Sequence, residues 1–377
     1  MRRVRSAHLT ATNSVALLFL RPGLYLFKFN LEMKESLPPI YFYIPQSQWP
    51  VGDMPQIPEE YSDWMSAWNS RYGRGKYDWT LQTYLYLKAD GLSCKLIDFM
   101  PKEGIVISHR DFLSDNLKPS SKLLIVCIKV DREPHPYAQL QVVQNHQDEL
   151  LKRSQFLWQS YPLRFWLQSK LIPRDRSRGD RFENAAFFGV LGTLAAQLQQ
   201  PQWEEQLNAL GLRWDVVKCD RWHDYSEVDV IVAVRSFEGS NTFDSKPASK
   251  LINAWHAGIP AVLGRESAYR HERKSELDYI EVASTEEAIA ALFRLKNDLN
   301  LRQKMVNNGT IRAQDMGNNK ITLQWRNFLT NVAVPAYYRW CMASVVQQQI
   351  FLIRRYLILK ANRVQRQFNQ LLSVKSP

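Results

Sequence analysis

The strongest constraint on the fold is an alternation of short apolar runs with helical patterns, which occurs twice along the 377 residues. Apolar runs of about four to eight residues between turn residues are typical of buried strands, and their alternation with helices indicates a parallel sheet. The first series contains one clear helical pattern, at 78–88. Its predicted strands are 40–44, 94–99, 104–108, 123–130 and 139–143.

A polar crossover separates the two series. The segment 150–180 is rich in aromatic residues and ends in LIPRDRSRGDR at 171–181, after which the alternation begins again. Two successive parallel sheets are typical of a protein with a cleft between two domains. We therefore predict an α/β fold of two Rossmann-like domains that face a cleft. The second series has predicted strands at 182–188, 213–219, 228–234, 259–263 and 279–282, and helices at 193–210, at 248–256 and after the capping box Ser284-x-x-Glu287.

The net charge of +12 lies entirely at the two ends of the chain. Residues 1–30 carry five basic and no acidic side chains, residues 331–377 carry seven and none, and the body is neutral. A neutral body lacks the basic surface that nucleic-acid binding requires, so we expect no nucleic-acid partner. We divide the chain into a disordered extension at 1–35, domains at 36–165 and 166–330, and a basic amphipathic helix at 331–377.

The C-terminal segment has an apolar residue at every third or fourth position, which is the period of one helix face. Two interpretations stay open: this face packs against the body of the protein, or the basic helix rests on an anionic membrane surface. The apolar positions are Val346, Ile350, Ile353, Leu357, Ala361, Val364, Phe368 and Leu371.

The four cysteines lie far apart and form no C-x-x-C, which argues against a disulfide framework and a structural zinc site. The apolar run at 15–20 ends after six residues at Arg21, too short to span a bilayer, and no other stretch is long enough. We expect a cytoplasmic protein, with the inner face of the membrane as a further location.

The most informative motif is 235–264, where a predicted strand leads through a polar loop into a helix and Gly258 returns the chain to a strand. Lys246 and Lys250 lie in or near the first turn of that helix. Free backbone N–H groups and the helix dipole favour anions there, so the arrangement suits a diphosphate. The alternative interpretation is an ordinary core helix with two solvated lysines.

The same region resembles the C-terminal domain of GT-B glycosyltransferases, especially retaining family 4. The stretch at 253–260, NAWHAGIP, is similar to the second half of the family's donor motif, with Asn253 and Ser245 at the positions of its two glutamates. The run at 187–192, FFGVLG, is similar to its first strand and glycine turn, with Val190 in place of an arginine. A group with the pattern K-P-x-x-K-L-x-N-A-W is a closer match.

The resemblance implies a second domain that binds a nucleotide-diphosphate sugar and a first domain that binds the acceptor. It implies metal-independent transfer to a glycan or a lipid-linked acceptor, with no cofactor. Gly73 and Gly75 resemble the acceptor-side glycine loop, although glycines in a basic loop are common. The residues expected to bind the donor are Lys246, Lys250, Asn253, Arg235, Glu238, Gly189, Gly192, His223 and Tyr225.

Two of these assignments have structural alternatives. The cluster at 222–225 could stack on a base or sugar, or it could be an aromatic lid packed on the sheet. His109 ends an apolar strand, and the family often has a cleft histidine on this side. We therefore predict His109 as a catalytic residue, while His109-Arg110-Asp111 could equally be a local turn with an ion pair.

We predict a glycosyltransferase. The alternative is a sugar-nucleotide or glycan-binding protein that has kept the fold and lost catalysis, and a third possibility is a membrane-surface scaffold. The motifs of P-loop enzymes, zinc proteases and serine hydrolases do not occur in the sequence.

Overall fold

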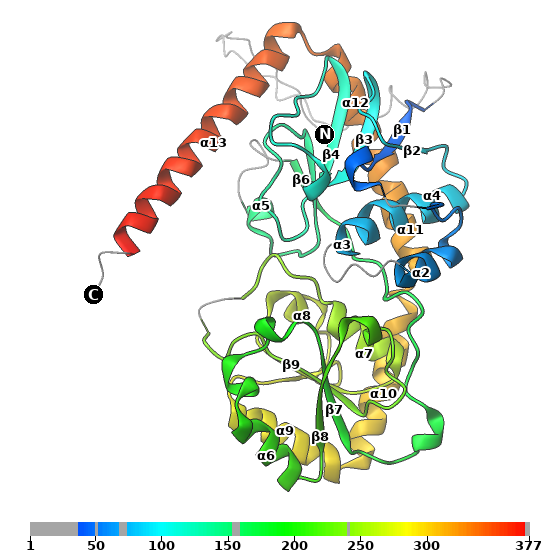
Figure 1. Ribbon diagram of the computed structural model, residues 1–377, viewed down its shortest axis with the longest axis vertical. Helices are drawn as coiled ribbons and strands as arrows, with labels where there is room; N and C mark the ends of the chain where they lie inside the picture. The colour runs from blue at the N-terminus through cyan, green and yellow to red at the C-terminus, as the bar shows by residue number, and fades with distance from the viewer. Residues whose placement is uncertain (1–36, 50–51, 68–73, 153–158, 240–241, 374–377) are drawn as a thin grey trace, which may run out of the picture. The chain divides into compact units, whose positions relative to one another are not determined.

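The computed structural model describes residues 37–49, 52–67, 74–152, 159–239 and 242–373 (Figure 1). The predicted extension at 1–35 and Gly73 lie outside these residues. Residues Pro38–Pro377 form one unit that contains both predicted sheets. All strand pairs in both sheets are parallel, so the predicted α/β class with two parallel sheets is confirmed.

The first sheet has six strands in the order β2-β1-β3-β4-β5-β6. Ile105 lies opposite Leu124, and alternate residues of β3 and β4 enter two different apolar cores, as expected for a sheet covered on both faces. Strand β6 was not predicted, because its sequence, QSYP, lacks an apolar run. The strands are β1 (Ile40–Tyr43), β2 (Lys95–Ile97), β3 (Glu103–His109), β4 (Lys122–Ile128), β5 (Leu140–Val143) and β6 (Gln159–Pro162).

The helical segment predicted at 78–88 is confirmed, but it begins with a π-helical turn, η2, which packs on β3. Aromatic and aliphatic residues of this segment fill the core above the sheet. The helical elements of this half are η1 (Gln46–Gln48), α2 (Pro58–Ala67), α3 (Arg74–Tyr77), η2 (Asp78–Gln82), α4 (Thr83–Ala89), η3 (Arg110–Phe112) and α5 (Glu149–Lys152).

The second sheet has five strands in the order β11-β10-β9-β7-β8. From β7 the chain adds β8 on one side and then β9 on the other, so the strand order reverses between β7 and β9. Ligands of open parallel sheets bind at the carboxyl ends of the strands at such a reversal. The strands are β7 (Asn184–Phe188), β8 (Arg213–Val217), β9 (Val230–Ala233), β10 (Ala261–Leu263) and β11 (Ile280–Glu281).

The helix predicted at 193–210 is wrong in its first half. Pro201 stands at the first position of α6, where its missing N–H costs nothing, and Gln200 before it is extended. Two short 3-10 turns occupy the residues between β7 and α6. The predicted capping box before α9 forms, since the Ser284 side chain accepts a bond from the Glu287 N–H. The helical elements of this half are η4 (Arg176–Arg178), η5 (Leu191–Thr193), η6 (Ala196–Gln199), α6 (Pro201–Ala209), η7 (Cys219–Arg221), α7 (Ser249–Ala257), α8 (Ser267–Glu272), α9 (Thr285–Asn297) and α10 (Leu299–Gln314).

The chain returns to the first core after α10. Ile321, Trp325 and Phe328 of α11 (Asn318–Phe328) are buried with residues of the first sheet, as are η8 (Leu329–Ala333) and much of α12 (Val334–Met342). The predicted boundary at 330 therefore assigns α11 to the wrong half. The sequence pattern could not reveal this, because an apolar helix face does not say which core it covers.

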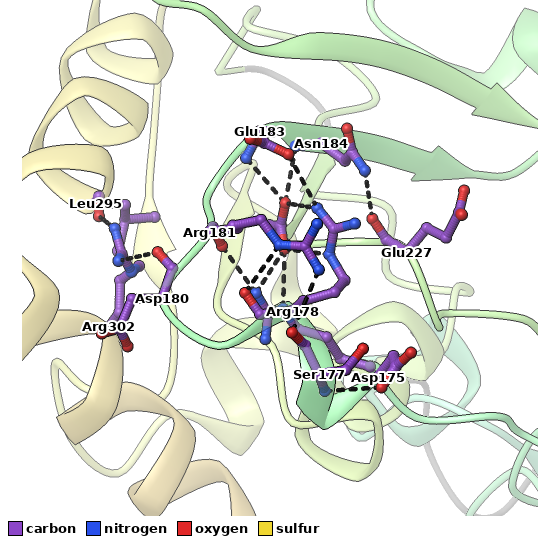
Figure 2. A network of polar contacts seen from close by, with 12 residues as sticks. Asp175, Ser177, Arg178, Asp180, Arg181, Glu183, Asn184, Glu227, Leu295 and Arg302 are labelled. Atoms are coloured by element: carbon purple, nitrogen blue, oxygen red, sulfur yellow. Dashed lines mark hydrogen bonds and ion pairs between the residues drawn. The ribbon is translucent and has the colours of Figure 1, made fainter.

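A buried carboxylate, Asp229, just before β9, is one of the groups that fix the crossover to the second half. It accepts hydrogen bonds from Arg174 and Arg178 and from the backbone N–H groups of Glu183 and Asn184. Figure 2 shows Arg178, Glu183 and Asn184 converging in this network, with Arg302 contacting the backbone of Asp180. Hydrogen bonds and charge together compensate the cost of burying Asp229.

The predicted C-terminal helix is two helices, α12 and α13 (Val345–Ser373), because Ala343 is extended. Within the residues that the structure describes, no helix is both long enough and apolar enough to span a membrane.

Candidate functional site

A cavity of about 600 Å³ lies at the carboxyl edge of the second sheet. Its wall consists of the segments that follow β7 and β8 and of the first turns of α7, which follows β9. The cavity therefore lies at the reversal of strand order, where the topology places a ligand site. The lining residues from this half are Phe188, Gly189, Val190, Thr193, Cys219, Asp220, Trp222, His223, Tyr225, Ser249, Lys250 and Asn253.

The opposite wall comes from α2, the helical segment 74–89 and the start of the crossover. Asp78 belongs to the π-helical turn η2 and accepts a 2.5 Å hydrogen bond from the Tyr61 hydroxyl. Asp63 is paired with Lys170 at the rim. A polar wall thus faces the sheet edge across the cavity. Its residues are Tyr61, Ser62, Asp63, Met65, Gly75, Asp78, Gln82, Phe165, Leu167, Gln168, Ser169 and Lys170.

Lys250 is the distinctive charge of the cavity. It lies in the first turn of α7, partly buried, with its ammonium 5.4 Å from the centre of the Phe187 ring. Its ammonium forms no hydrogen bond or ion pair with the described part of the chain. Burial lowers the pKa of Lys250 to about 7, and the nearby Arg235 acts in the same direction. An anion in the cavity would relieve this unfavourable environment.

The helix that carries Lys250 begins without a side-chain cap, because Ala248 occupies the capping position. The first N–H groups of α7 therefore have no side-chain acceptor, and the positive end of the helix dipole lies beside the cavity. An anionic group in this place would accept bonds from the backbone as well as from Lys250.

Gly189 allows close approach at the end of β7. A Cβ atom at this position would lie 2.6 Å from the Phe187 ring, so any side chain would displace that ring. Gly192 is different: it lies in an exposed turn, and a Cβ atom there would meet nothing within 4 Å. Of these two predicted glycines, only Gly189 lines the cavity.

Asn253 and Tyr225 form the floor next to Lys250. The Asn253 amide donates to the Tyr225 hydroxyl at 3.2 Å, and the Tyr225 ring stacks on Phe188 with centroids 4.0 Å apart. Tyr225 is buried, so its ring belongs to the core and only its edge borders the cavity. His223 also lines the cavity and is partly buried. Tyr225 therefore fits the packed alternative, while Trp222 and His223 line the cavity.

The other predicted cations are neutralised by the protein. The Lys246 ammonium lies 2.5 Å from Asp131, and Arg235 donates to Glu266 at 2.9 Å. Burial favours the neutral form of Asp131, but the hydrogen bond and charge of Lys246 outweigh it and lower the pKa of that carboxyl. Glu238 is exposed in the loop after β9. Lys246 and Arg235 are therefore ion-paired within the protein, and unlike Lys250 they do not line the cavity.

His109 is placed differently from the prediction. It is buried at the end of β3, and its Nδ1 accepts a hydrogen bond from the Asp111 N–H, which closes the turn η3. Burial lowers the pKa of His109 to about 4. His109 does not line the cavity. Its side chain instead forms part of a local turn, which is the alternative interpretation of the sequence. Gly75 does line the cavity, on the wall opposite Lys250.

Sequence reasoning missed Asp78 and Gln82 on the opposite wall. Both line the cavity and belong to the π-helical turn η2, an element that no residue pattern predicts. Among the described residues there is no group of three or more side chains suited to hold a metal ion.

No protein-family profile matches the chain, and no curated protein matches it. Solved structures do resemble it. Sucrose-phosphate synthase from Thermosynechococcus elongatus is 12% identical with a TM-score of 0.43, over 61% of this chain and 74% of its own. Anabaena HepE in complex with UDP-glucose is 8% identical with a TM-score of 0.46, over 78% of this chain and 100% of its own.

A third structure is the pneumococcal O-GlcNAc transferase GtfA in complex with UDP and GlcNAc. It is 11% identical with a TM-score of 0.45, over 68% of this chain, which spans only 60% of the length of GtfA. With TM-scores below 0.5, these similarities carry no conclusion about this protein. The fold rests on the strand order, and the function must rest on the cavity.

Proposed function

We propose that the protein is a glycosyltransferase of the GT-B type that transfers a sugar from a nucleotide-diphosphate sugar to a glycan or lipid-linked acceptor. The observation that carries this proposal is Lys250, a cation with no hydrogen-bond or ion-pair partner among the described residues, in a cavity at the reversal of strand order. The proposal assigns the diphosphate of the donor to Lys250 and to the first N–H groups of α7.

The remaining donor groups fit the neighbouring residues. Gly189 allows the backbone to approach the diphosphate, and the Asn253 amide can donate to and accept from a sugar hydroxyl. His223, beside Trp222, would border the base. In the reaction the bond from the anomeric carbon to the diphosphate oxygen breaks, and negative charge grows on the diphosphate. Lys250 and the helix dipole would stabilise this charge without a metal ion.

The acceptor would lie on the opposite wall of the cavity. Its hydroxyl oxygen forms the new bond to the anomeric carbon and loses its proton. Of the two carboxylates on that wall, Asp63 is paired with Lys170, and Asp78, which accepts a hydrogen bond from Tyr61, is the one that would accept this proton. Gln82 and Gln168 offer further hydrogen bonds for orienting a glycan.

A non-catalytic sugar-nucleotide-binding protein is the second candidate. Lys246 is paired with Asp131 and Arg235 with Glu266, which leaves Lys250 as the cation for the diphosphate. This candidate is favoured because a single cation stabilises the charge of a leaving diphosphate less than several would. Both candidates require donor binding, and only the first requires turnover.

The test is a thermal-shift panel of nucleotide sugars, followed by measurement of nucleoside diphosphate release with the sugar that binds. We expect stabilisation by at least one nucleotide sugar and release that increases when an acceptor is added. Binding without release would favour the second candidate, and no stabilisation by any nucleotide sugar would contradict both.

We further propose a cytoplasmic location. A lipid-linked acceptor would require the enzyme at the inner face of a membrane. The helix α13 is the element that could contact such a surface.

A further inference from the structure

The helix α13 docks on the rest of the protein through one narrow side. The Gln348 amide donates to the Trp340 carbonyl at 2.8 Å and to the Ser121 carbonyl at 3.2 Å. The Phe351 ring packs on Trp340 with centroids 5.3 Å apart, and Arg355 is only 5% exposed. These three positions, at steps of three and four, define the docked side of the helix.

The opposite side of α13 is apolar and exposed. At about 100° per residue, five large apolar residues lie within about 60° of one another and about half a turn away from Arg355. Each exposes more than half of its surface, which is unusual for a contiguous row of such residues. We call this row the apolar stripe; it consists of Val346, Ile350, Ile353, Leu357 and Val364.

The charge around the apolar stripe is of one sign. Residues 345–377 contain six basic and no acidic residues, and Arg354 and Lys360, both exposed, lie at the two margins of the stripe. A second copy of the helix would bring like charges together, which disfavours dimerisation through this surface. An anionic bilayer instead offers apolar chains to the stripe and phosphate groups to its basic margins.

We propose that α13 is a membrane-surface helix that inserts the apolar stripe into an anionic lipid surface while its docked side holds the enzyme. The helix lies in the plane of the interface, with Arg354 and Lys360 at the level of the headgroups. This inference concerns where the protein works and does not depend on the reaction proposed for the cavity.

The experiment is flotation of the full-length protein with two kinds of vesicle, phosphatidylglycerol mixed with phosphatidylcholine, and phosphatidylcholine alone. Binding is expected to the anionic vesicles only, with release at high salt. Ile350→Ser/Leu357→Ser should lower the partition coefficient at least about tenfold, because the variant lacks two apolar side chains that the bilayer would bury on binding. The matched control is Ile311→Ser/Leu323→Ser, at 64% and 53% exposure, which should leave binding unchanged.

A second pair of variants tests the charges. Arg354→Gln/Lys360→Gln should lower partitioning about tenfold or more, whereas Arg294→Gln/Lys304→Gln, on exposed positions of α9 and α10, should not. No flotation with anionic vesicles, or equal flotation of the stripe variant and wild type, would overturn the proposal. So would a wild-type dimer that the stripe variant converts to a monomer without any vesicle binding. Nucleotide-sugar binding, measured separately by calorimetry, should be the same in all these variants.

Discussion

The chemistry proposed for the cavity depends on one lysine among several candidates. The sequence predicts Lys246 and Lys250 as cations near one helix start, with Arg235 as a further donor-binding cation. In the structure, Asp131 and Glu266 neutralise Lys246 and Arg235, and neither acid lies near them in the sequence. The sequence thus indicated a helix whose first turns line the cavity, while long-range pairing decides which of these cations lacks an ion-pair partner among the described residues.

The first prediction follows from the lowered pKa of Lys250, about 7 in the ligand-free protein. A bound diphosphate raises that pKa, because the opposite charge favours the ammonium. Above pH 7 the complex therefore holds more protons than the free protein, and affinity must fall as pH rises. We expect the affinity for a nucleotide-diphosphate sugar, whose diphosphate does not titrate in this range, to be nearly constant from pH 6 to about 7 and to weaken by up to about tenfold per unit above it.

Calorimetry at several pH values checks this, and buffers of different ionisation enthalpy should show proton uptake on binding. Lys250→Met should remove the dependence above pH 7. An affinity that is flat from pH 7 to 9 in the wild type would contradict the role of a near-neutral lysine.

At the scale of the secondary-structure element, the close packing of Gly189 at the end of β7 affects both stability and the cavity. Gly189→Ala would place a methyl group against the Phe187 ring, over which the Lys250 ammonium lies. We expect an overpacking cost of about 1–3 kcal/mol in the free energy of unfolding, and weaker nucleotide binding because the ring and the lysine shift together.

Gly192→Ala is the matched control, three residues further on in open space. It should change the free energy of unfolding by no more than about 0.5 kcal/mol. Chemical denaturation and calorimetry of both variants measure the two effects. Equal behaviour of the two variants would mean that the close approach at Gly189 has no part in the site.

Elements were predictable where a local pattern sufficed. The strands of the second sheet were predicted within two residues at each end, since each is an apolar run between turn residues. The helix prediction at 193–210 was wrong in its first half because the helix begins at Pro201. Strand β6 was not predicted because Gln159 and Ser160 are not apolar. Asp78 and Gln82 of the opposite wall lie in a π-helical turn, which local propensity does not predict.

At the scale of the molecule, the two parallel sheets are linked because the chain returns to the first half after it has built the second sheet. Helices α11 and α12 follow the second sheet in sequence but complete the core of the first. Polar contacts also join the halves: Asn145, just after β5, donates to the Lys246 carbonyl and to the Ser267 hydroxyl. The return of α11 could not be predicted, because hydrophobic periodicity identifies a buried face but not its partner.

The most direct test of the central claim is calorimetric titration of nucleoside diphosphate into wild type, Lys250→Met and the control Lys304→Met, an exposed lysine of α10. A charge-assisted contact contributes about 1.5–3 kcal/mol, so Lys250→Met should weaken binding about tenfold to a hundredfold, and Lys304→Met should bind like wild type. Equal affinities of Lys250→Met and wild type, with both proteins folded, would contradict the assignment of the diphosphate to this cavity.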